Sequence, residues 1–522
     1  INSKRFYSSI INKDKLFLNL ITDYNVSTIN ENESRWLKQN STISYDFEAV
    51  KPGIDFFYEN KNEKNLLADS LLFTSLRYEE VSPFVELGLF DFLALTARSS
   101  FRNEYAPIKN SLEKQSEITT NSIQLNTIKS SQINSTLNVS VREKKYEDYF
   151  LETGFSNNKS VLIYSQNKVN ILNGFSENEL YYQTSTELTS KYERIFVKVP
   201  YGTGNYIYLG DLNNNGISEE NEFELNYYEG EYILVNYPTN QYTPTINLKA
   251  NLRFRLNFDK LFKRSNSFFS NINTETSWRI EENTTHSNLS DIYLMKLDKF
   301  LDDSTTISGN QIFQNDLFLY KNSSKASFRF RFIERRQLNN FNTGAERGFG
   351  SEKSIRMRLN LLKEINNQTD ITFTNDNLIS KNSINRARQL FNQELTTDFS
   401  YKPVSFLEVG FKIKVGENKD SYYLTPTTID LNSFSIRNTF YFTGVGRLRV
   451  EIERTELTAK TNGNLIPFEM TKGNYIGKNY YFRINFDYRL GNNLQSLINY
   501  DARLQGTNKI MHTLKAEARA FF

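Results

Sequence analysis

Residues 245–259 read TINLKANLRFRLNFD, and apolar side chains alternate with polar ones through the whole stretch. A β-strand points successive side chains to opposite faces, so this period predicts a strand with one apolar and one polar face. The same period recurs in residues 481–490, YFRINFDYRL, and in residues 513–522, TLKAEARAFF. Similar runs occupy residues 328–332, 355–361 and 407–415. The chain is therefore predicted to be all-β.

The composition favours a membrane sheet over a soluble one. The chain has 522 residues, with 41 Phe and 31 Tyr, but its mean hydropathy is only −0.56. Aromatic side chains need burial, and so polar a chain leaves little apolar material for a conventional core. A lipid-facing sheet needs apolar residues only at alternate positions. The alternative is a soluble β-sandwich or β-solenoid. The strands of about ten residues, the Phe-, Tyr- and Leu-rich face and the terminal Phe522 in register with that face favour an outer-membrane β-barrel.

The connections between the expected strands alternate between short and long. Outer-membrane barrels have short periplasmic turns and long external loops. If Phe522 is periplasmic, the strand that starts at Thr245 begins at the outer surface, and about thirteen strands follow to the C-terminus. Strands expected earlier in the chain, including separate ones at 161–165 and 169–173, raise the total to about 22 antiparallel strands. The long connections are residues 283–309, 337–352, 379–390, 417–431 and 458–479, and short ones include 263–266, 402–405, 444–446 and 491–493.

Three regions follow from this pattern. Residues 1–171 should supply N-terminal barrel strands, residues 172–244 an external β-subdomain, and residues 245–522 the C-terminal barrel strands.

No signal peptide is visible in the sequence, which starts at Ile1, although an outer-membrane protein must be exported. We therefore expect the N-terminus to be processed or truncated, so that an upstream domain could be missing.

A calcium-loop pattern lies in the expected external subdomain. Residues 211–222 read DLNNNGISEENE and match the twelve-residue loop pattern throughout. Gly216 allows the sharp turn, and the flanks at 206–209 and 223–228 look like strands, so this is a calcium loop on a β-scaffold and not an EF-hand pair. The alternative is an ordinary Asn-rich turn. The pattern predicts one Ca²⁺ site whose ligands are Asp211, Asn213, Asn215, the Ile217 carbonyl, Glu219 and Glu222.

Two stretches carry a resemblance to a known group of proteins. The segment GTGNYIYLGDLNNNGISEENEF, residues 202–223, is followed by GEYILVNYPT, residues 230–239. Together with the ending HTLKAEARAFF, residues 512–522, it resembles large, mostly uncharacterised surface proteins of the Bacteroidota. The resemblance implies an outer-membrane location and little about activity.

Other classes of function are disfavoured. The two histidines, His286 and His512, form no Ser-His-Asp or metal-binding spacing, and the chain has no Cys, so no enzyme is predicted. The Gly202–Gly204 pair fits tight β-turns better than a phosphate loop. A net charge of +3 gives no reason to expect a nucleic-acid partner.

The predicted function is a transport or secretion channel with a calcium-stabilised extracellular cap. A barrel of about 22 strands encloses a lumen too wide for side chains to fill. The alternative is a non-transporting surface scaffold, or a subunit of an envelope complex that binds a partner protein or glycan. A TonB-dependent receptor and a secretion translocon are special cases of the channel. The expected lumen-lining residues are Arg253, Arg255, Arg329, Arg331, Arg356, Arg358, Lys412 and Lys414.

Overall fold

The computed structural model is an all-β chain. It describes residues 2–12, 15–29, 31–128, 130–216, 218–262, 268–285, 300–341, 344–380, 387–460, 466–491, 493–505 and 509–520. The N-terminal strands are β1 (Asn2–Asn12), β2 (Leu16–Ile29), β3 (Asn32–Tyr45), β4 (Val50–Asn65), β5 (Ser70–Leu71), β6 (Leu76–Phe90), β7 (Leu93–Ile108), β8 (Ser111–Thr127), β9 (Ile133–Tyr146), β10 (Asn158–Ile171), β11 (Ser176–Lys198), β12 (Gly204–Tyr208) and β13 (Phe223–Gly230).

The second half continues in the same way. Its strands are β14 (Tyr232–Asn257), β15 (Ile272–Thr284), β16 (Thr306–Leu319), β17 (Ala326–Phe341), β18 (Gly344–Asn360), β19 (Ile365–Ser380), β20 (Arg388–Val404), β21 (Leu407–Asp420), β22 (Thr427–Phe442), β23 (Gly446–Lys460), β24 (Gly477–Arg489), β25 (Leu494–Gln505) and β26 (Met511–Ala520). Short helices are α1 (Asp148–Glu152), η1 (Leu172–Gly174), η2 (Glu220–Glu222), α2 (Phe258–Leu261), η3 (Phe268–Asn271) and α4 (Phe468–Thr471).

The long strands form one antiparallel wall in which each pairs with the next along the chain. Only the short β5, β12 and β13 lie off this ladder, so that β4 pairs with β6 and β11 pairs with β14. The wall has 22 strands from β2 to β26, and β1 adds one more beside β2. The predicted fold class is confirmed, as are the thirteen strands from Thr245 onward.

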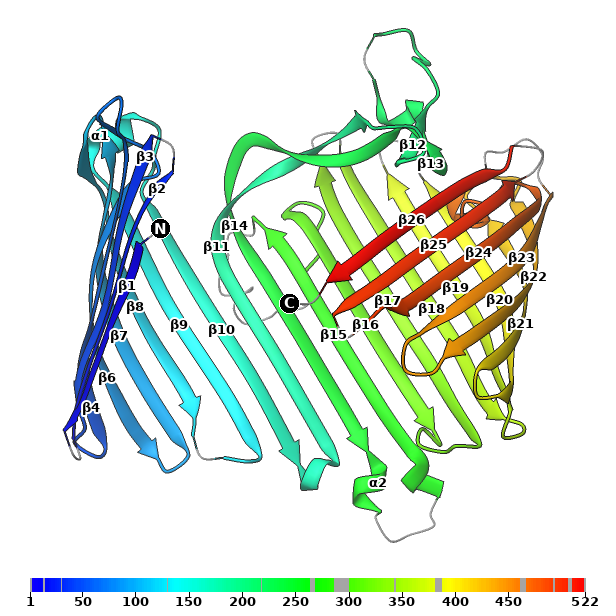
Figure 1. The fold of residues 1–522 in the computed structure, drawn as a ribbon, viewed down its shortest axis with the longest axis horizontal. Helices are drawn as coiled ribbons and strands as arrows, with labels where there is room; N and C mark the ends of the chain where they lie inside the picture. Colours follow the sequence, from blue (N-terminus) through cyan, green and yellow to red (C-terminus); the bar gives the residue numbers. More distant parts are fainter. Residues whose placement is uncertain are drawn as a thin grey trace.

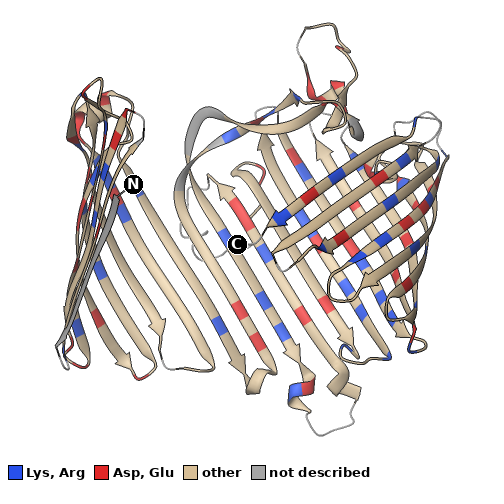
Figure 2. Ribbon diagram, viewed as in Figure 1, with Lys and Arg blue, Asp and Glu red and all other residues tan. Residues whose placement is uncertain are grey.

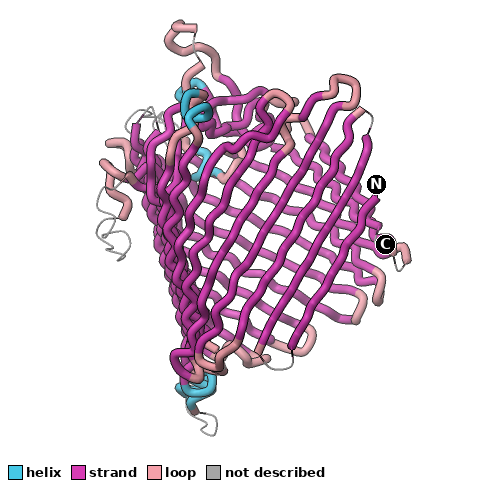
Figure 3. Tube along the Cα trace, turned by 90° about the vertical axis from the view of Figure 1, so that its left-hand side faces the viewer, coloured by secondary structure: helices cyan, strands magenta, loops and turns pink. Residues whose placement is uncertain are grey.

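The wall curls into a barrel, as Figures 1 and 3 show from two sides. β1 and β26 lie at separate edges in Figure 1, and no pairing joins them within the described residues. Because every step from β1 to β26 along the wall is antiparallel, these two edge strands run in the same direction.

The two faces of the wall differ as the alternation predicts. Ile452 on β23 is 57% exposed and Leu252 on β14 is 40% exposed, whereas the neighbouring Glu453 and Arg253 lie on the opposite face in ion pairs. Apolar side chains on the outer face of a barrel contact the hydrocarbon of the membrane, which explains why this face is exposed in the isolated chain. No helix in the described part of the chain is long and apolar enough to span a membrane.

Several predicted boundaries are wrong, and for one reason. In the stretch 337–352, expected to be a long loop, residues 337–341 belong to β17 and residues 344–352 to β18. The expected pair of strands at 161–165 and 169–173 is the single strand β10. The wall strands run 10 to 17 residues outside β11 and β14, so their ends extend beyond the regular apolar alternation from which the boundaries were read. Phe522 lies outside the described residues.

The region boundary at residue 172 also moves. Residues Ser176–Glu187 of β11 pair with Thr245–Leu256 of β14, so this stretch belongs to the wall. Only the continuation, from about residue 188 to Pro244, rises beyond it. β11 was missed because its wall-forming half, SENELYYQTSTE, has too few apolar residues for a clean alternation.

Candidate functional site

The predicted lumen-lining residues share the inner face of the wall, and acidic residues accompany them. Arg253 on β14 donates to Glu275 on β15 at 2.7 Å, and Arg255 donates to Glu177 on β11 at 3.3 Å. Figure 2 shows basic and acidic positions side by side along these strands. Lys414 lies 3.8 Å from Glu394, and Lys412 is in register opposite Asp398. The inner wall is thus polar and largely paired in charge.

The four arginines on β17 and β18 lie side by side as a strip, with acids at its sides. Arg329 is in register directly opposite Arg356. Arg331 donates to Asp316 at 2.7 Å, and Arg356 donates to Asp370 at 2.5 Å. Arg358 donates to Gln368 at 3.2 Å. The strip is therefore less basic than four arginines alone, because Asp316 and Asp370 compensate two of them.

One interaction spans three strands of the inner wall. Arg437 on β22 reaches across β21 and donates to both oxygens of Asp398 on β20, at 3.2 and 3.3 Å. The guanidinium passes over Gly410, where an added Cβ would lie 2.6 Å from the Arg437 Nη2 atom. Gly410 is therefore the position that leaves room for this bridge.

A hairpin covers part of one end of the barrel, which we call the mouth. Beyond the wall, Tyr192–Lys198 of β11 pair with Tyr232–Pro238 of β14, and β12 and β13 lie at the tip. We call residues 188–244 the cap. Its apolar side chains include a cluster of aromatic rings: those of Phe196 and Phe223 stack at 3.8 Å, with Tyr206 edge-on to Phe196. Figure 1 shows the cap bending over the mouth.

A single arginine docks the cap on the rim of the wall. Arg194 donates to Glu346 on β18 through both terminal nitrogens, at 3.1 and 3.0 Å, and also to Glu220 of the cap at 2.6 Å. Its guanidinium lies 3.8 Å from the ring centroid of Phe341 on β17. Only 11% of the Arg194 side chain is exposed, so the bidentate pair is shielded from water.

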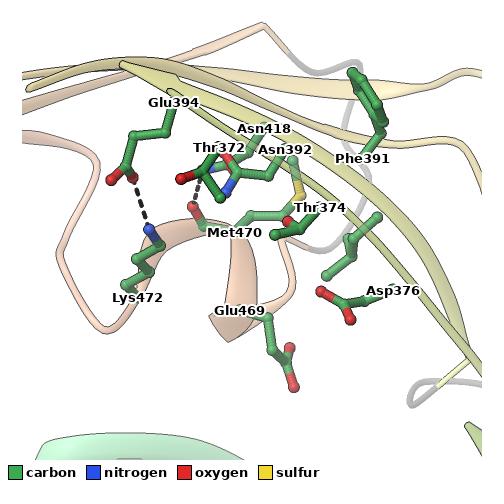
Figure 4. A pocket seen from close by; sticks show the side chains of 11 residues that line it. Thr372, Thr374, Asp376, Phe391, Asn392, Glu394, Asn418, Glu469, Met470 and Lys472 are labelled. Carbon is green, nitrogen blue, oxygen red and sulfur yellow. Dashed lines mark hydrogen bonds and ion pairs between the residues drawn. The ribbon is translucent and has the colours of Figure 1, made fainter. Parts of the chain in front are cut away.

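A second element folds onto the inner wall at the mouth. The connection between β23 and β24 carries α4, and Met470 packs into a buried cluster with Leu390, Ile429, Leu431 and Leu457. The Asn418 amide donates to the Met470 carbonyl at 2.7 Å, and Lys472 donates to Glu394 at 2.8 Å. A cavity of about 280 Å³ lies between this element and β19–β21 (Figure 4). We call residues 466–476 the inner loop.

The predicted calcium ligands lie together in the loop that joins β12 to β13. Asp211 accepts the amide hydrogens of Asn215 at 3.1 Å and of Gly216 at 2.7 Å, and these bonds, Gly216 first, hold the pKa of Asp211 below its usual value. The Asn213 and Asn215 amides donate to Glu219 at 2.8 and 3.2 Å.

Glu222 is the fully buried member of this loop. Its carboxylate accepts the amide hydrogens of Leu212 at 2.9 Å and Glu219 at 3.1 Å. Burial of the phenol, and then the negative charge of Glu222, raise the pKa of Tyr208. Ile217 lies outside the described residues. Across the part of the chain that is described, no three His, Asp or Glu side chains are grouped to hold a metal ion.

The residues that build the mouth were not singled out by the sequence. Arg194 and Glu346 are 152 residues apart, and no spacing or motif connects them. Met470 and Gly410 stand in unremarkable local contexts. Of the two histidines, His512 shares a hydrogen bond of 2.8 Å with the Tyr500 hydroxyl, and His286 lies outside the described residues.

No protein-family model and no curated protein matches the chain. Solved outer-membrane proteins resemble its fold. The siderophore receptor PirA from Acinetobacter baumannii is 9% identical, with 98% of this chain and 74% of that chain covered at a TM-score of 0.31. The FrpB iron transporter from Neisseria meningitidis is 7% identical, with 98% and 82% covered at 0.35. A bacterial polysaccharide outer membrane secretin is 8% identical, with 85% and 91% covered at 0.24. At these values, the cargo of those proteins says nothing about the function of this chain.

The wall itself defines the environment of the chain. Within a membrane every backbone polar group needs a partner, which a sheet curled into a barrel provides between neighbouring strands. The outer face carries exposed apolar side chains and the inner face carries ion pairs. The chain is a multi-strand outer-membrane β-barrel with lipid around its apolar face.

Proposed function

We propose that this chain is a channel whose water-filled lumen is partly closed at the extracellular mouth by the cap and the inner loop. The observation that carries the proposal is the polar, ion-paired inner wall of a barrel with this many strands. Side chains alone do not fill a barrel of more than 20 strands, so the charged groups need water or a moving solute beside them.

The mouth supports a gated channel. The cap is held to the rim through one buried guanidinium, and the inner loop is held by Met470 and by the ion pair of Lys472 with Glu394. Both elements stand on the side of the connection between β23 and β24, which is the side expected to face outwards.

Channel activity is tested by planar-bilayer conductance of the wild type and of Arg194→Ala. Loss of the dock should free the cap and raise the mean conductance or the frequency of full openings. Lys198→Ala is the matched control, because this cap lysine is 68% exposed and contacts Glu231 and the Tyr232 ring, which both belong to the cap. A barrel that gives no conductance steps in either form would contradict the channel.

We also propose that Ca²⁺ rigidifies the cap loop. The observation that supports this is Glu222, a fully buried carboxylate whose partners within the described residues are neutral donors. A buried charge is costly without a compensating charge, and a cation held also by Asp211, Asn213, Asn215 and Glu219 would supply it. Hard oxygen donors of this kind suit Ca²⁺.

The second candidate function, a subunit of an envelope complex, is favoured by the two edges of the wall, which pair with each other nowhere in the described residues. β1 and β26 lie apart in Figure 1 and run in the same direction. Unpaired strand edges are costly in lipid and act as templates for further strands. Extraction in mild detergent should then recover a larger assembly; a chain that migrates alone, with conductance intact, would leave the channel as the function.

A further inference from the structure

The cap and the inner loop enclose a cleft that the channel proposal does not use. Its volume is about 370 Å³, within the range of sites for small ligands. Aromatic side chains line it from both sides: Phe196, Tyr206 and Phe223 belong to the cap, and Tyr423, Phe468 and Tyr475 belong to the opposite rim. Because the two sides come from separate parts of the chain, a ligand in the cleft would touch both mouth elements.

The flat faces in the cleft are already ordered. Phe196 and Phe223 are nearly parallel, with an interplanar angle of 4° and ring centroids 3.8 Å apart. They are fixed by Tyr206 and Tyr232, which stand edge-on to them at 5.2 and 5.1 Å. Pre-ordered aromatic faces bind flat apolar surfaces of a ligand at little cost in conformational entropy.

The charges around the cleft disfavour an anionic ligand. Arg388 and Glu469 pair with each other at 2.7 Å, and Glu220 pairs with Arg194 at 2.6 Å. Glu224 adds an exposed carboxylate, which accepts hydrogen bonds and repels anions. The exposed Asn221 adds an amide that both donates and accepts. The lining thus combines flat apolar faces with hydrogen-bonding groups suited to hydroxyls.

We propose that this cleft binds a neutral saccharide. A pyranose ring offers apolar C–H faces to stack on the aromatic rings and hydroxyls around its edge for Glu224 and Asn221. This inference goes beyond the channel, since it holds whether or not the lumen conducts.

The test is a calorimetric titration of the purified full chain with maltotriose, cellotriose and chitotriose. The chain is held in a detergent without a sugar head group. At least one trisaccharide should bind. Tyr423→Ala should weaken that binding roughly three- to tenfold, as expected for loss of one stacking ring. Asn221→Trp, a change at an exposed position, should fill the cleft and abolish binding. The control Tyr201→Ala removes a cap tyrosine that is 64% exposed and does not line the cleft, so it should bind as the wild type does.

Two further probes decide the class of ligand: a blocked neutral tripeptide and an alkyl diol. Binding of either probe in the cleft without binding of any trisaccharide would overturn the proposal. So would the failure of all probes to bind, or saccharide binding that Asn221→Trp and Tyr423→Ala leave unchanged. Saccharide binding that Asn221→Trp abolishes, Tyr423→Ala weakens and Tyr201→Ala leaves unchanged supports it.

Discussion

At the scale of single residues, alternation predicts the face of a side chain but not its partner. The eight expected lumen residues alternate with apolar side chains along their strands, and their place in the lumen stays a prediction. Their partners depend on register between strands. Arg437 shows the limit: it bonds to Asp398, 39 residues away and two strands across, over a glycine whose role no sequence spacing reveals.

Gly410→Ala tests this bridge. The added Cβ would lie 2.6 Å from the Arg437 guanidinium, so the side chain must move away from Asp398. Loss of a partly shielded, charge-assisted pair should lower the free energy of unfolding by about 1–2 kcal/mol. The urea midpoint of the folded barrel measures it. Gly88→Ala is the control, since its Cβ would have only an ordinary contact at 3.9 Å. Equal midpoints for the two variants would refute the role given to Gly410.

At the scale of elements, strands were well predicted where apolar residues alternate and poorly where they do not. β24 and β26 were found from their period. The alternation predicts a loop where the upper parts of β17 and β18 lie, because polar residues on both faces are tolerated outside lipid. The cap loop was found from a motif of twelve contiguous residues, but the docking of the cap by Arg194 could not be found, because it joins remote segments.

Opposite faces of β24 should respond differently to a new charge. Phe486→Arg puts a charge on the lipid face and should cost about 2–4 kcal/mol near the midplane. Asn485→Arg places the same charge on the inner face and should be mild. The measurement is the fraction of each variant that assembles into detergent-resistant barrel. Equal tolerance of both substitutions would be incompatible with a lipid-facing Phe486.

Calcium removal should loosen the cap loop. In a chelator, protease cleavage between residues 211 and 222 should speed up, because the ion would stabilise only the ordered loop, by about 2.7 kcal/mol at a hundredfold excess over its dissociation constant. Glu222→Gln should be cleaved quickly with or without calcium. Leu212→Ala, an exposed position in the same loop, is the control. If the chelator leaves the rate of cleavage unchanged, the loop is an ordinary Asn-rich turn and the calcium site is refuted.

At the scale of the whole molecule, the number of strands and the curling of the wall into a barrel followed from the sequence, whereas the arrangement of the mouth did not. The number of alternating segments along the chain gives the number of strands, and this number sets the circumference of the barrel. The folding of the cap and of the inner loop over the lumen depends on contacts such as Arg194 with Phe341, which join segments that lie far apart in the sequence.

The orientation of the barrel can be read by tags. A tag at Asn214, in the cap loop, should be labelled on intact cells, whereas a tag at Gly444, in the short turn between β22 and β23, should need a permeabilised outer membrane. Long connections on the outside are the physical basis. The reverse pattern of labelling would contradict this orientation and would place the cap in the periplasm.

The account depends most on the claim that the polar face of the wall lines water. The chain has no Cys, so single cysteines can be introduced along β24 without background. Cysteines at Arg483, Asn485 and Asp487 should react with a small membrane-impermeant thiol reagent in assembled barrels, and cysteines at Phe482, Ile484 and Phe486 should not. Reaction that is uniform along the strand, or confined to the second set, would contradict an aqueous lumen on this face.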